Sequence, residues 1–136
     1  MEEKYAKHIP RLKFMYWVTI FAVGVMGVFY LFFESIVMGS LKWTYRDPIM
    51  VNIYGAIQVA MGVLSVFGLK KPLRYIPVLM IQLIYKILAS IAIIPRLITS
   101  SDAPRSGWVF IVIYLFIIIA DLWAIPWKYV FGPEKE

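Results

Sequence analysis

Four long apolar runs take up most of this 136-residue chain, and they constrain its fold more than any other feature. They cover about residues 14–33, 49–69, 75–94 and 108–127. Each is long enough to cross ~30 Å of hydrocarbon as an α-helix. The runs do not alternate polar and apolar residues, and four strands cannot close a membrane barrel. The sequence therefore predicts an all-α integral membrane four-helix bundle, with residues 1–136 as a single domain.

The composition supports a membrane location. Hydrophobic residues make up 62% of the chain, which leaves too little polar surface for a soluble domain of this size. Aromatic residues make up 17%, which suits belts at the two membrane interfaces; Trp43, Tyr45 and the segment 125–129 are the expected anchors. The first apolar run is longer and bulkier than the core of a signal peptide, so we interpret it as a membrane helix.

Short connections separate the four runs, at residues 41–48, 68–72 and 99–106. We expect Asp47 to cap the second helix ahead of Pro48, Gly68 to end it, and Pro72 to begin the third. Short connections make consecutive helices antiparallel neighbours, which predicts an up-down-up-down order. Three further prolines are expected to end or kink helices: Pro77, Pro95 and Pro126.

Lysine and arginine are unevenly divided between the two ends of such a bundle. Nine fall on the side of the chain termini: Lys4, Lys7, Arg11, Lys13, Lys70, Lys71, Arg74, Lys128 and Lys135. Four fall on the other side: Lys42, Arg46, Arg96 and Arg105. Because basic loops stay in the cytoplasm, both termini are predicted to be cytoplasmic and the protein to be a multi-pass plasma (inner) membrane protein.

Two charges interrupt the apolar runs, Lys86 in the third and Asp121 in the fourth. A charge at the centre of a bilayer costs at least ~2.5–3.5 kcal/mol, so each needs a partner or a function. Antiparallel helices would let the two form a buried pair. The pair would either fix the register of the helices or belong to a ligand or proton site. Lys128 is an alternative partner for Asp121.

Further polar residues recur at helical spacing around these charges. Gln82, Lys86 and Ser90 share one face of the third helix, and Gln58 and Gln82 fall near the membrane midplane. If the glutamines point inward, the bundle has a polar centre ringed by tyrosines; if they point outward, they mark an interface between subunits. The candidate ligand-binding residues are Lys86, Asp121, Gln58, Gln82, Tyr54, Tyr85 and Tyr114.

The first two helices also carry patterned faces. Small residues on the second helix suit close packing, with Ala56 and Ala60 as the clearest small-xxx-small pair beside Gly55 and Gly62. One stripe on the first helix contains Tyr16, Thr19, Val23, Gly27, Tyr30 and Glu34. Glu34 lies at a helix end, where it is either solvated or paired with Arg96 or Arg46.

Several functional classes lack the residues that they require. The chain has no cysteine and one histidine, His8, so thiolate metal sites, bis-histidine haem and a Ser–His–Asp triad are not expected. No glycine-rich nucleotide motif follows a strand, and the basic residues do not form one face for nucleic acid. We therefore predict no catalytic residues, no metal and no nucleic-acid partner. No cofactor is expected either, other than a bound lipid or quinone.

The middle of the chain, Ile53–Leu88, carries a family resemblance. A helix dotted with Gly55, Gly62 and Gly68 runs through the basic turn 70–74 into a helix that holds Tyr85 and Lys86. This quarter of the chain, with the size and the four helices, resembles the small DoxX-like membrane proteins. The resemblance implies a bacterial or archaeal inner-membrane protein, in some cases tied to quinone or redox systems.

Three functions remain open at this point. The first is a non-enzymatic protein that acts as a homo-oligomer or as a subunit of a larger membrane complex. The second is a binder or carrier of a small hydrophobic molecule, a quinone or a lipid, inside the bundle. The third is a proton-coupled transporter of the small-multidrug type, for which Glu34 is the only membrane carboxylate in the first helix.

Overall fold

The computed structural model describes residues 3–42 and 47–133, and this part of the chain contains helices and no strands. Trp43, Tyr45, Arg46 and Lys135, which the sequence singled out, lie outside the described residues. The elements in order are η1 (Glu3–Tyr5), α1 (Ile9–Val18), η2 (Thr19–Gly24), α2 (Val25–Phe32), α3 (Glu34–Leu41), α4 (Pro48–Lys70), α5 (Ile76–Thr99), α6 (Ser106–Ala124) and α7 (Trp127–Val130).

In the described part of the chain, four helices are long and apolar enough to cross a membrane, as the sequence predicts. The first is continuous over Ile9–Phe32, because α1 passes through the π-helical segment η2 into α2. The others are α4, α5 and α6. Large apolar side chains cover their outer faces; Phe21 is 62% and Phe32 70% exposed. Such a surface is stable against lipid rather than water.

Three boundaries differ from those predicted, each for a local reason. The first long helix begins at Ile9 and not near residue 14, with Pro10 in its first turn. The basic residues before residue 14 interrupt the apolar run but are compatible with a helix. The third does not end at Ile94 but continues through Pro95 to Thr99, whose hydroxyl donates to the Pro95 carbonyl at 2.8 Å. The fourth ends at Ala124 because Pro126 holds Ile125 in an extended conformation.

The helix ends confirm one predicted cap and correct two. Asp47 caps α4 as predicted, since its Oδ1 accepts from the backbone N–H of Ile49 at 3.1 Å. Gly68 does not end α4, which continues to Lys70. Gly68 is buried inside the helix instead, where a Cβ would lie 2.7 Å from the ring of Tyr16. Pro72 does not begin α5; Pro77 occupies that role.

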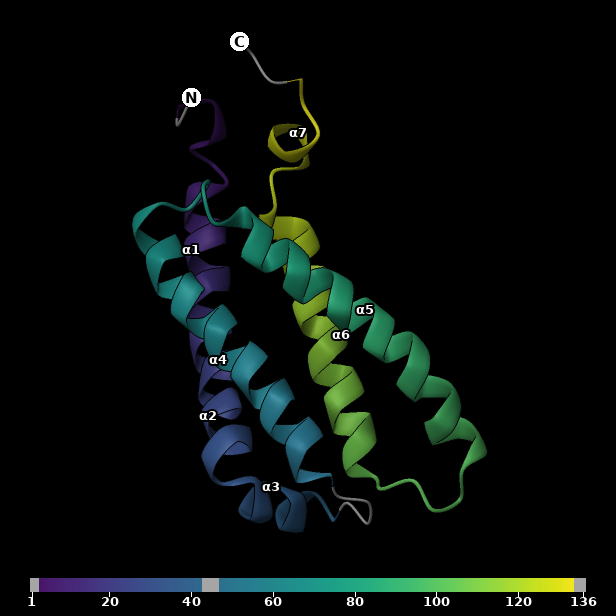
Figure 1. The fold of residues 1–136 in the computed structure, drawn as a ribbon. Coiled ribbons are helices and arrows are strands. Elements are labelled where there is room, and N and C mark those ends of the chain that lie inside the picture. The colour runs from purple at the N-terminus through teal and green to yellow at the C-terminus, as the bar shows by residue number, and fades with distance from the viewer. Residues whose placement is uncertain (1–2, 43–46, 134–136) are drawn as a thin grey trace.

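The bundle consists of two helical pairs (Figure 1). The segment Ile9–Phe32 packs along α4, and α5 packs along α6. From the end at which they are joined, α4 and α5 spread apart toward the other end, where Ser106 at the start of α6 still donates to the Leu41 carbonyl of α3 at 2.9 Å. The elements nearest the two termini lie together at the closed end, where the rings of Tyr5 and Tyr129 are 5.2 Å apart. We call the first pair the N-terminal hairpin and the second the C-terminal hairpin.

The N-terminal hairpin packs through glycine. A Cβ on Gly62 would lie 2.8 Å from the Gly24 Cα, and a Cβ on Gly27 would lie 2.8 Å from the Gly55 carbonyl oxygen. The two backbones therefore approach more closely than any other residue type would allow. The predicted Ala56/Ala60 pair is not part of this contact, because both alanines are exposed.

An apolar cluster closes the end at which the hairpins meet. Leu12 and Met15 from the first helix pack with Leu79 from α5 and Ile117 from α6, and each of these side chains is at most 2% exposed. The Tyr16 hydroxyl adds a hydrogen bond to the Pro72 carbonyl at 2.7 Å. These contacts fix the closed end, so the space between the hairpins lies toward the open end.

Candidate functional site

The predicted charges are both buried, but they do not pair directly. Lys86 is 2% and Asp121 0% exposed. The Lys86 ammonium instead donates to the Tyr85 hydroxyl at 2.8 Å and lies 4.2 Å from the centre of the Tyr114 ring. No ion pair joins the two charges within the described ranges. The ammonium is stabilised by a phenol oxygen and by aromatic ring faces, and this stabilisation is weaker than an ion pair with a carboxylate would give.

Asp121 belongs to a second polar group, deeper in the closed half. Its Oδ2 accepts from Gln82 Nε2 at 3.0 Å, and Gln82 Oε1 lies 3.1 Å from the Thr19 hydroxyl. That hydroxyl also lies 2.9 Å from the Met15 carbonyl, and its single proton serves one acceptor at a time. The chain Thr19–Gln82–Asp121 thus joins both hairpins by hydrogen bonds. Thr19 was absent from the predicted site, although it lies in the stripe of the first helix.

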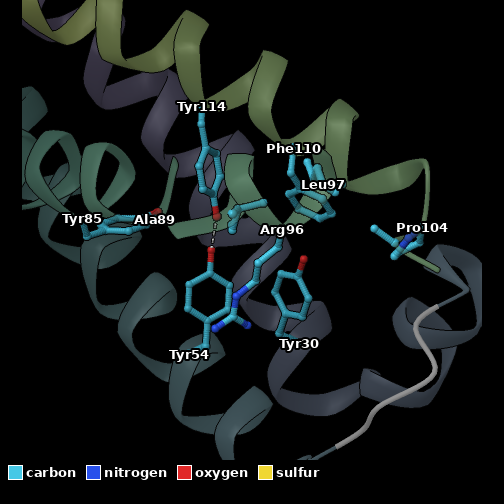
Figure 2. A pocket seen from close by; sticks show the side chains of 12 residues that line it. Tyr30, Tyr54, Tyr85, Ala89, Arg96, Leu97, Pro104, Phe110 and Tyr114 are labelled. Atoms are coloured by element: carbon cyan, nitrogen blue, oxygen red, sulfur yellow. Dashed lines mark hydrogen bonds between the residues drawn. The ribbon is translucent and has the colours of Figure 1, made fainter. Parts of the chain in front are cut away.

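Tyrosines gather where the hairpins begin to separate (Figure 2). Tyr54 on α4 and Tyr114 on α6 share a hydrogen bond of 2.7 Å between their hydroxyls, which bridges the hairpins. The ring centres of Tyr85 and Tyr114 are 6.4 Å apart, and those of Tyr30 and Tyr54 are 5.4 Å apart. Gln58 lies beside the Tyr85 hydroxyl. The structure therefore brings together the three predicted tyrosines and adds Tyr30.

A pocket of about 510 Å³ extends from these tyrosines toward the open end. Its walls are apolar apart from four tyrosines and one arginine: Tyr30, Tyr54, Tyr85, Ala89, Ile93, Arg96, Leu97, Ala103, Pro104, Gly107, Phe110 and Tyr114. Of the seven predicted site residues, only the tyrosines line it. Gln58, Gln82, Lys86 and Asp121 lie outside its walls.

Among the described residues, four buried side-chain atoms have no hydrogen-bond partner: Tyr30 OH, Gln58 Oε1, Ser90 Oγ and Asp121 Oδ1. An unpaired polar atom away from water costs about 1–3 kcal/mol, so each marks a place where a partner would stabilise the protein. Only the Tyr30 hydroxyl belongs to a residue that lines the pocket. Tyr30 is 2% exposed.

The predicted partners of Glu34 are only partly within the described residues. Glu34 accepts from the Asn52 side chain at 3.2 Å, and no ion pair with Arg96 is present in the described part of the chain. The alternative partner, Arg46, lies outside that part. Arg96 is exposed and projects from α5 at the open end, where it lines the pocket together with Tyr30 and Tyr54 (Figure 2).

The site offers hydrogen-bond donors, aromatic faces and positive charge around an apolar space. Within residues 3–42 and 47–133, no group of three or more His, Cys, Asp and Glu side chains could hold a metal ion. No protein-family model, curated protein or solved structure matches the chain. The geometry of the site is therefore the basis for assigning a function.

Proposed function

We propose that this protein binds a small apolar molecule that carries a hydrogen-bond-accepting oxygen, in the pocket between the two hairpins. The observation that carries the proposal is the pocket itself, about 510 Å³ in volume, with the unpartnered Tyr30 hydroxyl in its wall. Binding pockets for small molecules measure ~300–1,000 Å³ and combine mostly apolar walls with a few placed polar groups. They occur between the helices of bundles, as here.

Lys86 supports the binding of such an oxygen from behind the wall. Its ammonium donates to the Tyr85 oxygen at 2.8 Å, so the Tyr85 proton points to another acceptor. The charge also polarises the Tyr85 hydroxyl and makes it a stronger donor. Tyr54 and Gln58 lie beside the same hydroxyl, so an oxygen that reaches the inner end of the pocket would compete with these two side chains for its proton.

We further propose an up-down-up-down course with both termini in the cytoplasm of a plasma (inner) membrane. The support is the excess of lysine and arginine beside the termini and the meeting of η1 with α7 at one end of the molecule. In this orientation the pocket opens in the outer half of the bilayer. Membership among the DoxX-like proteins stays a prediction.

The other two functions remain predictions. An oligomer or a complex subunit would use the outer face of α4, where Ala56 and Ala60 are exposed to a neighbour. A proton-coupled transporter would need Glu34 to change its surroundings, yet this carboxylate is held by Asn52 at the end of the first long helix.

A pocket-filling variant tests the proposed function. Ala89 lines the pocket, so Ala89→Phe places a ring where the molecule would lie. Ala92→Phe is the matched control, because Ala92 is exposed on the same helix and does not line the pocket. The probes are decylubiquinone, dodecanol and dodecanoate, and native mass spectrometry of the detergent-solubilised protein measures the bound fraction.

We expect at least one probe to bind the wild type and the Ala92→Phe variant, and to lose at least tenfold in affinity for Ala89→Phe. Equal binding of every probe to both variants would show that the pocket is not the binding site. Retained molecules of cellular origin, if present in the wild type, should be missing from the Ala89→Phe spectrum for the same reason.

A further inference from the structure

The charge around the pocket is one-sided. Of the residues that the structure describes, one arginine and no carboxylate belong to its walls. The Lys86 ammonium adds a second positive charge 4.2 Å from the centre of the Tyr114 ring that forms part of the inner wall. Asp121 is bonded to Gln82 and Glu34 to Asn52, and neither carboxylate lines the pocket.

Among the described residues, no carboxylate lines the open end of the pocket or forms an ion pair with Arg96. Asp102 and Arg105 stand in the connection beside Ala103 and Pro104; both are exposed and their charges offset each other. No ion pair of Arg96 is found in the described part of the chain, although its side chain lines an otherwise apolar wall. A guanidinium presents a planar set of donors that matches carboxylate and phosphate oxygens.

A second donor comes from the other hairpin. The Tyr30 hydroxyl comes from α2, is buried and has no partner. Arg96 comes from α5, so the two groups reach the same pocket from different hairpins. An oxyanion between them would satisfy the phenol donor and neutralise the guanidinium at once.

We infer that the bound molecule is an acidic amphipath: a single apolar chain that ends in a carboxylate or a phosphate. The oxyanion lies between Arg96 and the Tyr30 hydroxyl. The chain lies along the face of α5 that contains Ala89 and Ile93, a face that extends roughly 18 Å from Tyr85 to Leu97 at the helical rise. This inference rests on the proposed function and adds the chemical class of the ligand.

Matched probes at alkaline pH test the class of the ligand. Dodecanoate and dodecyl phosphate carry the two oxyanions, and dodecanol carries the same chain without charge. Native mass spectrometry measures their affinities for the wild type, Arg96→Gln, Arg96→Lys and Arg105→Gln. The last is the matched control, because Arg105 is an exposed cation at the same end that does not line the pocket.

We expect the wild type to bind at least one of the two anions at least tenfold more tightly than dodecanol. Arg96→Gln should reduce this preference to about equality, Arg96→Lys should retain part of it, and Arg105→Gln should keep it. The anion with the higher affinity identifies the head group.

Two outcomes separate this inference from the proposed function. Equal affinity for the anions and for dodecanol in the wild type, or equal effects of Arg96→Gln and Arg105→Gln, would overturn the acidic ligand while leaving the pocket as a binding site. Binding of all three probes that Ala89→Phe does not change would instead overturn the proposed function.

Discussion

The substitution Gly27→Ala tests how closely the N-terminal hairpin is packed. A Cβ at this position would lie 2.7 Å from the Gln58 Cβ, 2.8 Å from the Gly55 oxygen and 2.8 Å from the Val59 nitrogen. Two of these atoms belong to the backbone, so no side-chain rotation relieves the contact and the helices must separate. Overpacking costs ~1–3 kcal/mol, and replacing a helical glycine by alanine returns ~0.5–1 kcal/mol. We expect a net loss of about 0–2.5 kcal/mol in the free energy of unfolding, and a loss of about 1–3 kcal/mol relative to a glycine-to-alanine change that makes no such contact.

Gly39→Ala is the matched control, because no atom lies within 4 Å of a Cβ there and the glycine is exposed in α3. It should leave the protein as stable as the wild type or up to ~1 kcal/mol more stable. Reversible unfolding in mixed micelles at rising dodecyl sulfate fraction, followed by circular dichroism, measures both variants. If Gly27→Ala unfolds within ~0.5 kcal/mol of Gly39→Ala, which is the scatter of neutral surface changes, the tight glycine contact is wrong.

Three further predictions concern the polar groups and the orientation. In a double-mutant cycle, Tyr54→Phe and Tyr114→Phe should couple by ~0.6–1.5 kcal/mol in unfolding, and additive losses would show that their hydroxyls do not bond. Lys86→Met should leave the free energy of unfolding within ~1 kcal/mol of the wild type or raise it, because the loss of a hydrogen-bond donor is offset by the removal of a buried charge. The same variant should bind the probes severalfold more weakly. If it fails to fold, the role of the lysine is structural. The chain has no cysteine, so single cysteines report its orientation: an impermeant maleimide added to whole cells should label Ser101→Cys and not Lys4→Cys, and the reverse pattern would refute cytoplasmic termini.

Periodicity was enough to predict the four long helices and much of the buried surface. The stripe on the first helix is buried from Tyr16 and Thr19 to Tyr30. Of the two directions that the sequence left open for Gln58 and Gln82, the structure shows the inward one, at 4% and 0% exposure. These successes share a cause: a polar or small residue that repeats at helical spacing in an apolar run is stable only on the face turned away from lipid.

The sequence could not predict which buried groups pair. Charge alone favoured Lys86 with Asp121, but hydrogen-bond partners depend on helix rotation and depth, which no single-helix pattern contains. In the structure, Asp121 accepts a hydrogen bond from Gln82. The Lys86 ammonium donates to the hydroxyl of Tyr85, its neighbour in the chain. Arg96 was missed as a pocket residue because its position near the predicted end of an apolar run suggests an ordinary interfacial arginine.

The pocket results from unequal packing of the two hairpins. Glycines hold α4 against the first long helix at backbone contact, which leaves α4 little contact with α5 beyond the closed end. Small side chains at Ala89 and Gly107 do not fill the space that remains.

At the tyrosine cluster, the hydrogen bond between the Tyr54 and Tyr114 hydroxyls crosses this space and joins the two hairpins. A bound molecule that takes a hydroxyl of this pair would replace the bond between them, so occupancy and the separation of the hairpins should be linked. In the reverse direction, any substitution that loosens the glycine contact moves Tyr54 with α4, and it should weaken binding although it lies outside the pocket.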